Sequence, residues 1–289
     1  MKIADTHTHL YFTSFDRDRE KVVQRNKKSG VELEIQIGVD EVSSIAALEL
    51  AKNYNHIYCT LGVHPCDVET CFSPNPDYIP RDFKKYKRKA HNFDELFQLF
   101  EHLTEQYPEK IVGFGETGFD LYHQNTPELL ELQKNIFRRH IALAKKFGKP
   151  VVIHNRNSRE QMIQFLEIEF DYKSSDSKVK GIIHCFSEDT EYAELMTQKY
   201  GFFLGIGGVA TYPQSEKIRE AIKATPIEFL LTETDAPFLT PQKAKQQHKR
   251  NESSFLPEVI QLIAELKKIP KKECSEILFS NAKKVFGIK

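Results

Sequence analysis

Short apolar runs alternate with longer amphipathic stretches along most of the chain. The runs are rich in Val, Ile and Phe, as buried parallel strands are, and they fall at 2–4, 33–39, 57–63, 111–114, 150–153, 181–183, 202–206 and 228–232. Helix-like stretches lie between them at 17–29, 41–52, 93–107, 128–147, 159–170, 190–199 and 215–224. Eight strands alternating with helices predict an α/β fold, a (β/α)8 TIM barrel. The alternative is an open doubly wound sheet, with ligands at one switch point.

Two segments do not follow this alternation. Residues 66–91 contain Pro74, Pro76 and Pro80 and end in a basic run, so we expect a loop insertion or lid there. Residues 257–286 predict two helices that close the domain, with Pro270 between them. We therefore expect a single TIM-barrel domain over residues 1–289, with an insertion at about 66–91.

The composition of the chain argues against several classes of protein. The 289 residues carry 41 Lys plus Arg against 41 Asp plus Glu, and this zero net charge argues against a basic nucleic-acid coat protein or a polybasic membrane binder. A content of 40% hydrophobic and 28% charged residues excludes global disorder. The five cysteines form no CxxC pair, which argues against a disulfide scaffold and a cysteine-based zinc knuckle.

The N-terminus gives an expectation about location. The charged Asp5 follows only a very short apolar run, so no signal peptide is predicted, and no apolar stretch approaches the roughly 20 residues of a membrane span. We expect a cytoplasmic protein with no membrane contact and no obligate protein partner; a nuclear or organelle-matrix location stays open.

Histidines and acids follow several of the predicted strands. His7 and His9 end the first run, where the period of two puts both on one face, with Asp5 as a supporting partner. A His-x-His pair is weak evidence alone, because surface histidine pairs are common. The same pattern recurs at other strand ends, at Glu116, His154, His184 and the acids Glu233 and Asp235.

The joint pattern predicts a metal site. In a barrel, the carboxyl ends of the strands converge on one mouth, and six side chains are candidate metal ligands there: His7, His9, Glu116, His154, His184 and Asp235. Imidazoles and carboxylates suit Zn²⁺, Mn²⁺ and related ions. Six ligands exceed the need of one tetrahedral zinc, and a bridging Glu116 fits two ions about 3.5–4 Å apart.

Five motifs occur in order along the chain. They are Asp5-Thr6-His7-Thr8-His9-Leu10, Gly115-Glu116-Thr117-Gly118-Phe119-Asp120, His154-Asn155-Arg156, His184-Cys185-Phe186-Ser187 and Glu233-Thr234-Asp235-Ala236-Pro237. Together they resemble the motifs of the TatD family of metal-dependent deoxyribonucleases, within the amidohydrolase superfamily. The resemblance reaches from residue 5 to Ser280-Asn281-Ala282.

This resemblance implies a barrel, two divalent ions (Zn²⁺, Mg²⁺ or Mn²⁺) and 3′-to-5′ exonuclease or general phosphodiesterase activity on DNA. It further implies that one ion is held by His7, His9, Glu116 and Asp235, and the other by Glu116, His154 and His184. The sequence departs from the family pattern at Thr117 and Phe119, at Asn155 and Asn157, and at Ser253 in place of a proline. None of these departures removes a ligand, but together they bear on substrate preference.

The mechanistic hypothesis is metal-assisted phosphodiester hydrolysis. The catalytic candidates are Asp235, which orients or deprotonates the attacking water, and the bridging Glu116. His64 and Arg156 are candidate substrate contacts, since the rigid guanidinium fork suits a phosphoryl oxygen. A surface salt bridge for Arg156 and a hydrogen-bonded loop histidine for His64 are the alternatives.

A nucleic-acid substrate also needs cationic and stacking groups. The basic clusters at 84–89 and 243–250 are candidates for the rim of the mouth, although charge runs are usually solvated. Tyr11, Phe12 and Phe119 are either base-stacking surfaces or core residues. The glycines of 205–208 offer backbone amides to phosphate, a weak signal.

Two other functions remain open from the sequence. One is amide or ester hydrolysis on the same metal site, including removal of a D-amino acid from tRNA. No lysine stands at the strand-four position to form a carbamate bridge, and Glu116 there favours a nuclease-type site. The other is a binding protein with structural metals, against which six ligands at a barrel mouth argue.

Overall fold

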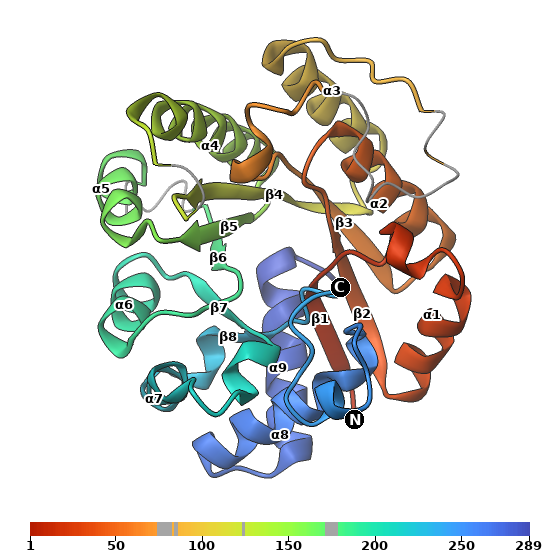
Figure 1. The fold of residues 1–289 in the computed structure, drawn as a ribbon, viewed down its shortest axis with the longest axis vertical. Coiled ribbons are helices and arrows are strands. Elements are labelled where there is room, and N and C mark those ends of the chain that lie inside the picture. The colour runs from red at the N-terminus through yellow and green to blue at the C-terminus, as the bar shows by residue number, and fades with distance from the viewer. Residues whose placement is uncertain (74–82, 84–85, 123–124, 171–178) are drawn as a thin grey trace. The chain divides into compact units, whose positions relative to one another are not determined.

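The computed structural model describes residues 1–73, 83, 86–122, 125–170 and 179–289. All eight predicted strands are present, and helices lie between them in the predicted order (Figure 1). The chain divides into two compact units: unit 1 comprises Met1–Gln36 and Ile182–Lys289, and unit 2 comprises Ile37–Gly181. Much of the predicted insertion (74–82 and 84–85) lies outside the described residues, and the single-domain organisation stays a prediction.

The strands of unit 1 are parallel to their neighbours. They are β1 (Ile3–Thr8), most of β2 (Val31–Ile37) and of β6 (Gly181–Ile183), β7 (Phe203–Ile206) and β8 (Leu230–Thr232). β1 pairs with β2, and β7 pairs with both β6 and β8. The segment after β8 returns to β1, because Asp235 N donates to His7 O at 2.8 Å and Thr8 forms a β-bridge with Ala236. The ends of β1 and β8 are therefore joined.

The helices of unit 1 are α1 (Arg19–Lys28), α6 (Thr190–Glu194), α7 (Glu216–Ala224), α8 (Leu256–Lys267) and α9 (Lys271–Phe286). α9 packs on β1 and β8 through an apolar face that includes Leu278, Ala282 and Val285 (Figure 1). The two predicted closing helices are confirmed, and Pro270 lies between them. The single predicted helix over 190–199 is instead α6 followed by a π-helical turn, Leu195–Lys199.

Unit 2 contains β3 (Ile57–Leu61), β4 (Ile111–Asp120) and β5 (Val151–Arg156), with α2 (Glu41–Asn53), α3 (Phe93–Gln106), α4 (Pro127–Phe147) and α5 (Arg159–Glu169). β4 pairs in parallel with β3 and β5. α4 begins with the cap Thr126, whose side chain accepts from Leu129 N, and ends at Gly148 in the left-handed region. The helix end predicted at residue 147 is confirmed.

β4 is ten residues long and continues past the predicted end at Phe114. Gly115 and Gly118 have φ of 112° and 136°, and a Cβ at either position would lie 2.4 Å from Val152 O or 2.1 Å from His154 O. Glycine is therefore required for the close approach of β4 to β5. The second half of β4 contains Glu116 and ends at Asp120, at the carboxyl end of the strand.

His140 on α4 makes a testable contribution to stability. It is buried; its Nε2 accepts from Val63 N at 3.2 Å, and its Nδ1 lies 2.8 Å from Ile136 O. Burial lowers the pKa of His140 to about 4, so the unfolded chain binds a proton between pH 4 and 6.5 that the folded chain does not. Stability therefore falls as pH drops through this range, by up to about 3 kcal/mol from this group.

The check is urea unfolding of the metal-free protein from pH 7.5 to 4.5, beside a His140→Gln variant. Glutamine retains a donor and an acceptor but does not titrate, so we expect a shallower pH dependence whatever its absolute stability. Identical slopes for both proteins would show that His140 does not contribute.

Candidate metal centre

Ionisable side chains gather at the carboxyl ends of strands in both units. The first cluster, in unit 1, consists of His7, His9, His184, Glu233 and Asp235. The second cluster, in unit 2, consists of His64, Glu116, Asp120 and His154.

The first cluster combines three imidazoles with two carboxylates. Asp235 Oδ1 lies 3.3 Å from His9 Nε2 and 3.6 Å from His7 Nε2. The His7 ring stacks on His184 with centroids 3.9 Å apart. Burial raises the pKa of Asp235, but the hydrogen bond with His9 and the charges of the imidazoles outweigh it, so the net shift is downward. Asp235 is thus held as a carboxylate.

Glu233 completes this cluster, and it is not among the six ligands predicted from the sequence. Its Oε1 accepts from Cys185 N and lies 3.5 Å from His184 Nδ1. Ligand atoms of His7, His184 and Glu233 all lie within 4.8 Å of one another. The buried Glu233 Oε2 accepts no hydrogen bond from the residues that the structure describes. A buried carboxylate oxygen in this state favours a cation as its partner.

Asp5 supports the first cluster through the backbone. Its carboxylate accepts from His7 N at 3.2 Å and Thr234 N at 3.0 Å, and from the hydroxyls of Thr234 at 2.6 Å and Ser253 at 2.7 Å. Burial raises the pKa of Asp5 to about 7. The predicted supporting role therefore takes a different form, since these bonds fix the main chain around His7 rather than the imidazole. His9 Nδ1 is oriented by Tyr11 Oη, at 3.0 Å.

The second cluster centres on Glu116, which is 3% exposed. Its Oε1 lies 2.7 Å from His154 Nδ1 and 3.2 Å from His64 Nε2, and the two imidazole nitrogens are 3.3 Å apart. Burial lowers the pKa of His64, but the charge of Glu116 raises it, and the net shift is upward. The cluster thus concentrates negative charge that attracts a cation or a protonated imidazole.

Asp120 lies on the other side of His154. Its Oδ2 is 2.9 Å from His154 Nε2, and its Oδ1 accepts from Tyr122 N at 3.0 Å. Burial raises the pKa of Asp120, but the hydrogen bond with His154 lowers it, and the net shift is downward. The motif pattern does not predict this contact, because it depends on which nitrogen of the His154 ring faces which carboxylate.

The two predicted substrate contacts, His64 and Arg156, have different surroundings. His64 belongs to the second cluster, and its Nδ1 accepts from Cys66 N at 3.1 Å. Arg156 ends β5, is exposed, and stacks its guanidinium 3.9 Å from the centroid of the Tyr122 ring. Arg156 is the register partner of Asp120, so it lies beside the second cluster, and its role toward substrate stays a prediction.

The aromatic residues predicted to stack on bases are buried, and the basic residue Arg250 is held in ion pairs. Tyr11, Phe12 and Phe119 are core residues, at 2%, 8% and 0% exposure, so they offer no open stacking face. Arg250 in the cluster 243–250 is committed to ion pairs with Asp18 at 2.8 Å and Glu252 at 2.9 Å, which ties it to the fold.

In the other basic cluster, residues 84 and 85 lie outside the described residues. Arg88 pairs with the buried Asp40 at 2.9 Å, with only 11% of the Arg88 side chain exposed. Arg88 therefore anchors the end of the predicted insertion to the N-terminus of α2 and does not extend into solvent.

The glycine-rich turn at 205–208 also has a packing explanation. A Cβ at Gly205 would lie 2.0 Å from Glu233 Oε2, and one at Gly208 would lie 2.0 Å from Leu239 O. These glycines make room for Glu233 and for the loop after β8. The suggested phosphate contact gains no support from this geometry.

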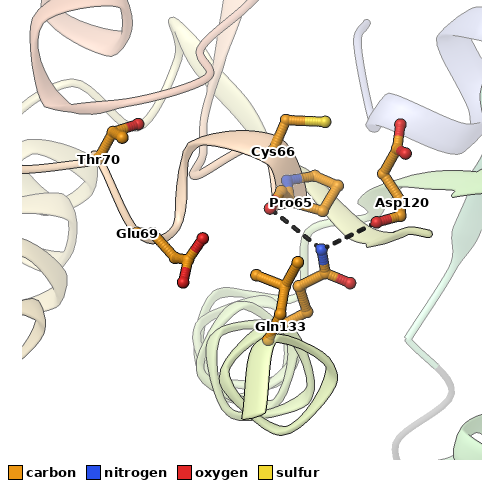
Figure 2. A pocket seen from close by; sticks show the side chains of 7 residues that line it. Pro65, Cys66, Glu69, Thr70, Asp120 and Gln133 are labelled. Carbon is orange, nitrogen blue, oxygen red and sulfur yellow. Dashed lines mark hydrogen bonds between the residues drawn. The ribbon is translucent and has the colours of Figure 1, made fainter. Parts of the chain in front are cut away.

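A cavity of about 280 Å³ adjoins the second cluster in unit 2. Figure 2 shows its lining side chains, with Asp120 and Cys66 at one end and Glu69 across from them; the full lining is Pro65, Cys66, Glu69, Thr70, Asp120, Leu129 and Gln133. Among the described residues, the lining carries two carboxylates and no cationic side chain. It therefore suits a group that donates hydrogen bonds better than it suits a phosphate.

The family follows from comparison with known proteins. Residues 4–287 match the family model described as TatD related DNase. The chain belongs to the TatD family. It is 35% identical, over 99% of both chains, to the Bacillus subtilis (strain 168) protein "Uncharacterized metal-dependent hydrolase YabD". It is 30% identical, over 99% of this chain and 98% of the other, to "Uncharacterized metal-dependent hydrolase YjjV" of Escherichia coli (strain K12).

A solved structure gives the fold class. The crystal structure of YJJV, a TATD homolog from Escherichia coli K12, superimposes with a TM-score of 0.81 at 27% identity, over 99% of this chain and 98% of that one. The predicted (β/α)8 TIM barrel is therefore confirmed for this TatD member. Membership places the chain in a family of metal-dependent hydrolases. No helix among the described residues is long and apolar enough to cross a membrane.

Proposed function

We propose that this TatD protein is a divalent-metal-dependent deoxyribonuclease that removes nucleotides from DNA in the 3′-to-5′ direction. The observation that carries the proposal is the presence of two imidazole–carboxylate clusters at strand ends in a chain that matches the TatD related DNase model. DNA as substrate, the exonuclease direction and a cytoplasmic location belong to the proposal.

The residues present fit divalent ions. Neutral imidazoles and carboxylates are ligands of Zn²⁺, Mn²⁺ and Mg²⁺ in proteins. Both clusters place such groups within 4.8 Å of one another, and Glu233 Oε2 is buried without a hydrogen bond from the described residues. A cation supplies the partner that these buried carboxylates need.

Two ions would be held as the family motifs imply. His7, His9, Glu116 and Asp235 would hold one ion, and Glu116, His154 and His184 the other. The shared role of Glu116 is proposed from the barrel topology, in which strand ends face a common mouth. Glu233 and Asp120 are further carboxylates, in the first and second clusters respectively.

Bound divalent ions supply acidity to a coordinated water and stabilise charge on the phosphoryl group. The side chains of the protein act on the attacking water and on the substrate. Asp235, held as a carboxylate against His7 and His9, accepts a proton from the attacking water and orients it. His64 and Arg156 donate hydrogen bonds to phosphoryl oxygens, Arg156 through its planar fork.

The cavity beside Asp120 favours a second candidate function. Its carboxylates, Asp120 and Glu69, suit an amino group, as on the aminoacyl part of a D-aminoacyl-tRNA or an amide substrate. Ester or amide hydrolysis on the same metal site would use this cavity directly. A non-catalytic protein with structural metals is a third, weaker candidate, because structural sites are closed with about four ligands.

A substrate panel separates these candidates. The metal-loaded protein is tested on 5′-labelled single-stranded DNA and RNA, a synthetic phosphodiester, D-aminoacyl-tRNA, a carboxyl ester and an amide. We expect shortening of the DNA from its 3′ end, with a kcat/KM above that on every other substrate. Preferred release of the D-amino acid would replace the nuclease assignment, and inactivity on all six substrates would refute hydrolytic function on these bonds.

A further inference from the structure

We propose that Asp120 is a positioning residue that fixes the tautomer of His154. It holds the ring proton on Nε2 and thereby presents Nδ1, on the side of Glu116, as the metal-binding nitrogen. The inference rests on the part of the proposed function that makes His154 a metal ligand, and it does not depend on DNA being the substrate.

Both nitrogens of the His154 ring lie next to a carboxylate. Nδ1 is 2.7 Å from Glu116 Oε1, and Nε2 is 2.9 Å from Asp120 Oδ2. A metal ligand must offer an unprotonated nitrogen. Nδ1 lies beside Glu116 and His64 Nε2, in the group whose ligand atoms fall within 4.8 Å, so this nitrogen is the one suited to a cation. The remaining proton then belongs on Nε2, where Asp120 accepts it.

The strand geometry places the two carboxylates on either side of the ring. Glu116 and Asp120 are four residues apart on β4, and their carboxylates contact opposite nitrogens of the ring, with the register shift of β4 against β5 between Phe114 and Thr117. Gly118, between them, is the register partner of His154 on β5. A side chain at Gly118 would occupy the space next to His154, since its Cβ would lie 2.1 Å from His154 O. The spacing Glu-x-Gly-x-Asp on β4 thus provides one carboxylate for each ring nitrogen of the histidine on β5.

Asp120 is itself held in place. It is 3% exposed, and its second carboxylate oxygen accepts from Tyr122 N. Its backbone carbonyl accepts from Gln133 Nε2 at 3.2 Å, and the same amide donates to Pro65 O at 3.1 Å (Figure 2). Gln133 on α4 therefore ties the end of β4 to the turn after His64. A carboxylate fixed in this way orients a metal-binding imidazole and raises its basicity.

The first test is metal affinity, measured by calorimetry with Zn²⁺ and with Mn²⁺ on the full chain. Asp120→Ala is expected to weaken one binding step by about 10- to 100-fold. Asp120→Asn, which retains one acceptor oxygen but no charge, is expected to show a smaller loss. Glu69→Gln removes a carboxylate from the same cavity wall and serves as the matched control, with unchanged metal affinity expected.

The second test reads the tautomer directly. Long-range proton–nitrogen NMR of the zinc-loaded protein, with histidine labelled by ¹⁵N, is expected to show His154 protonated at Nε2 and bound to zinc through Nδ1. Asp120→Asn is expected to shift or exchange-broaden the Nε2–H signal. This readout separates positioning from a merely structural role and covers the case in which Asp120→Ala does not fold.

Several results would overturn the inference. They are zinc bound through His154 Nε2, wild-type metal affinity in both Asp120 variants, an equal loss in Glu69→Gln, or no metal binding by the wild type. Failure of the nuclease assignment looks different, because a wild-type protein that binds metal without cutting DNA leaves the predicted affinity loss and tautomer intact.

Discussion

Glu116→Ala is expected to lower kcat/KM on DNA by about 10³-fold or more and to reduce the bound metal per chain. Metal ions contribute several kcal/mol of charge stabilisation to such reactions, and each 1.36 kcal/mol is a tenfold change in rate. The substitution removes the carboxylate that lies 2.7 Å from His154 and 3.2 Å from His64. Steady-state kinetics and elemental analysis on the same samples measure both effects.

Glu116→Gln is the companion variant because it retains the shape of the side chain and loses only its charge. We expect nearly the same loss from it, since a neutral amide is a much poorer partner for a cation. Thermal unfolding of both variants checks the fold. Turnover at the wild-type rate in either folded variant would show that the bridging role is wrong.

Asp235→Asn is expected to lower kcat by about 10²- to 10⁴-fold, the usual contribution of a general base. KM is expected to change little, because Asp235 is proposed to act on the water and not on the DNA. The residue has φ of 55°, and asparagine tolerates this left-handed conformation, so the loop after β8 is expected to keep its shape.

The decisive comparison for Asp235→Asn is the split between kcat and KM. A rise in KM with unchanged kcat would assign Asp235 to substrate binding and contradict the proposed role. His7 and His9 lie 3.6 and 3.3 Å from its Oδ1, so metal content is measured in parallel to separate loss of the base from loss of the ion.

The architecture was predictable because the strands begin as short apolar runs and the helices are the amphipathic stretches between them. Each of the eight strands overlaps its predicted run, and α4 ends at Phe147, where the predicted stretch 128–147 ends. The length of β4 was not predictable from apolarity, because its second half consists of Gly, Thr, Phe and acids. Pairing with β5, made possible by Gly115 and Gly118, adds these residues to the strand.

The site was predictable as a set of imidazoles and carboxylates at strand ends, but not as a network of contacts. His7, His9, His184 and Asp235 fall in one cluster, and Glu116 and His154 fall in the other. Asp120 and Glu233 were not among the predicted ligands, because their contacts depend on which atom faces which ring. That information lies in the packing of β4 on β5 and of Gly205 against Glu233.

The roles of the basic and aromatic side chains outside the two clusters were the least predictable feature. A lysine- and arginine-rich segment has the same composition whether it binds a ligand or pairs with the protein's own acids. Arg88 and Arg250 turned out to be held by Asp40 and Asp18. Phe12 and Phe119 lie near the ends of strands, where an aromatic ring can be buried in the core or can face a ligand. Both rings are buried.

The most direct test of the central claim is cleavage of 5′-labelled single-stranded DNA by three preparations: the purified protein, the protein after removal of metal by a chelator, and the chelator-treated protein after addition of Mg²⁺, Mn²⁺ or Zn²⁺. The account predicts progressive shortening from the 3′ end, loss of activity on metal removal, and recovery with at least one ion. Cleavage at an undiminished rate by protein shown to contain no metal would contradict it.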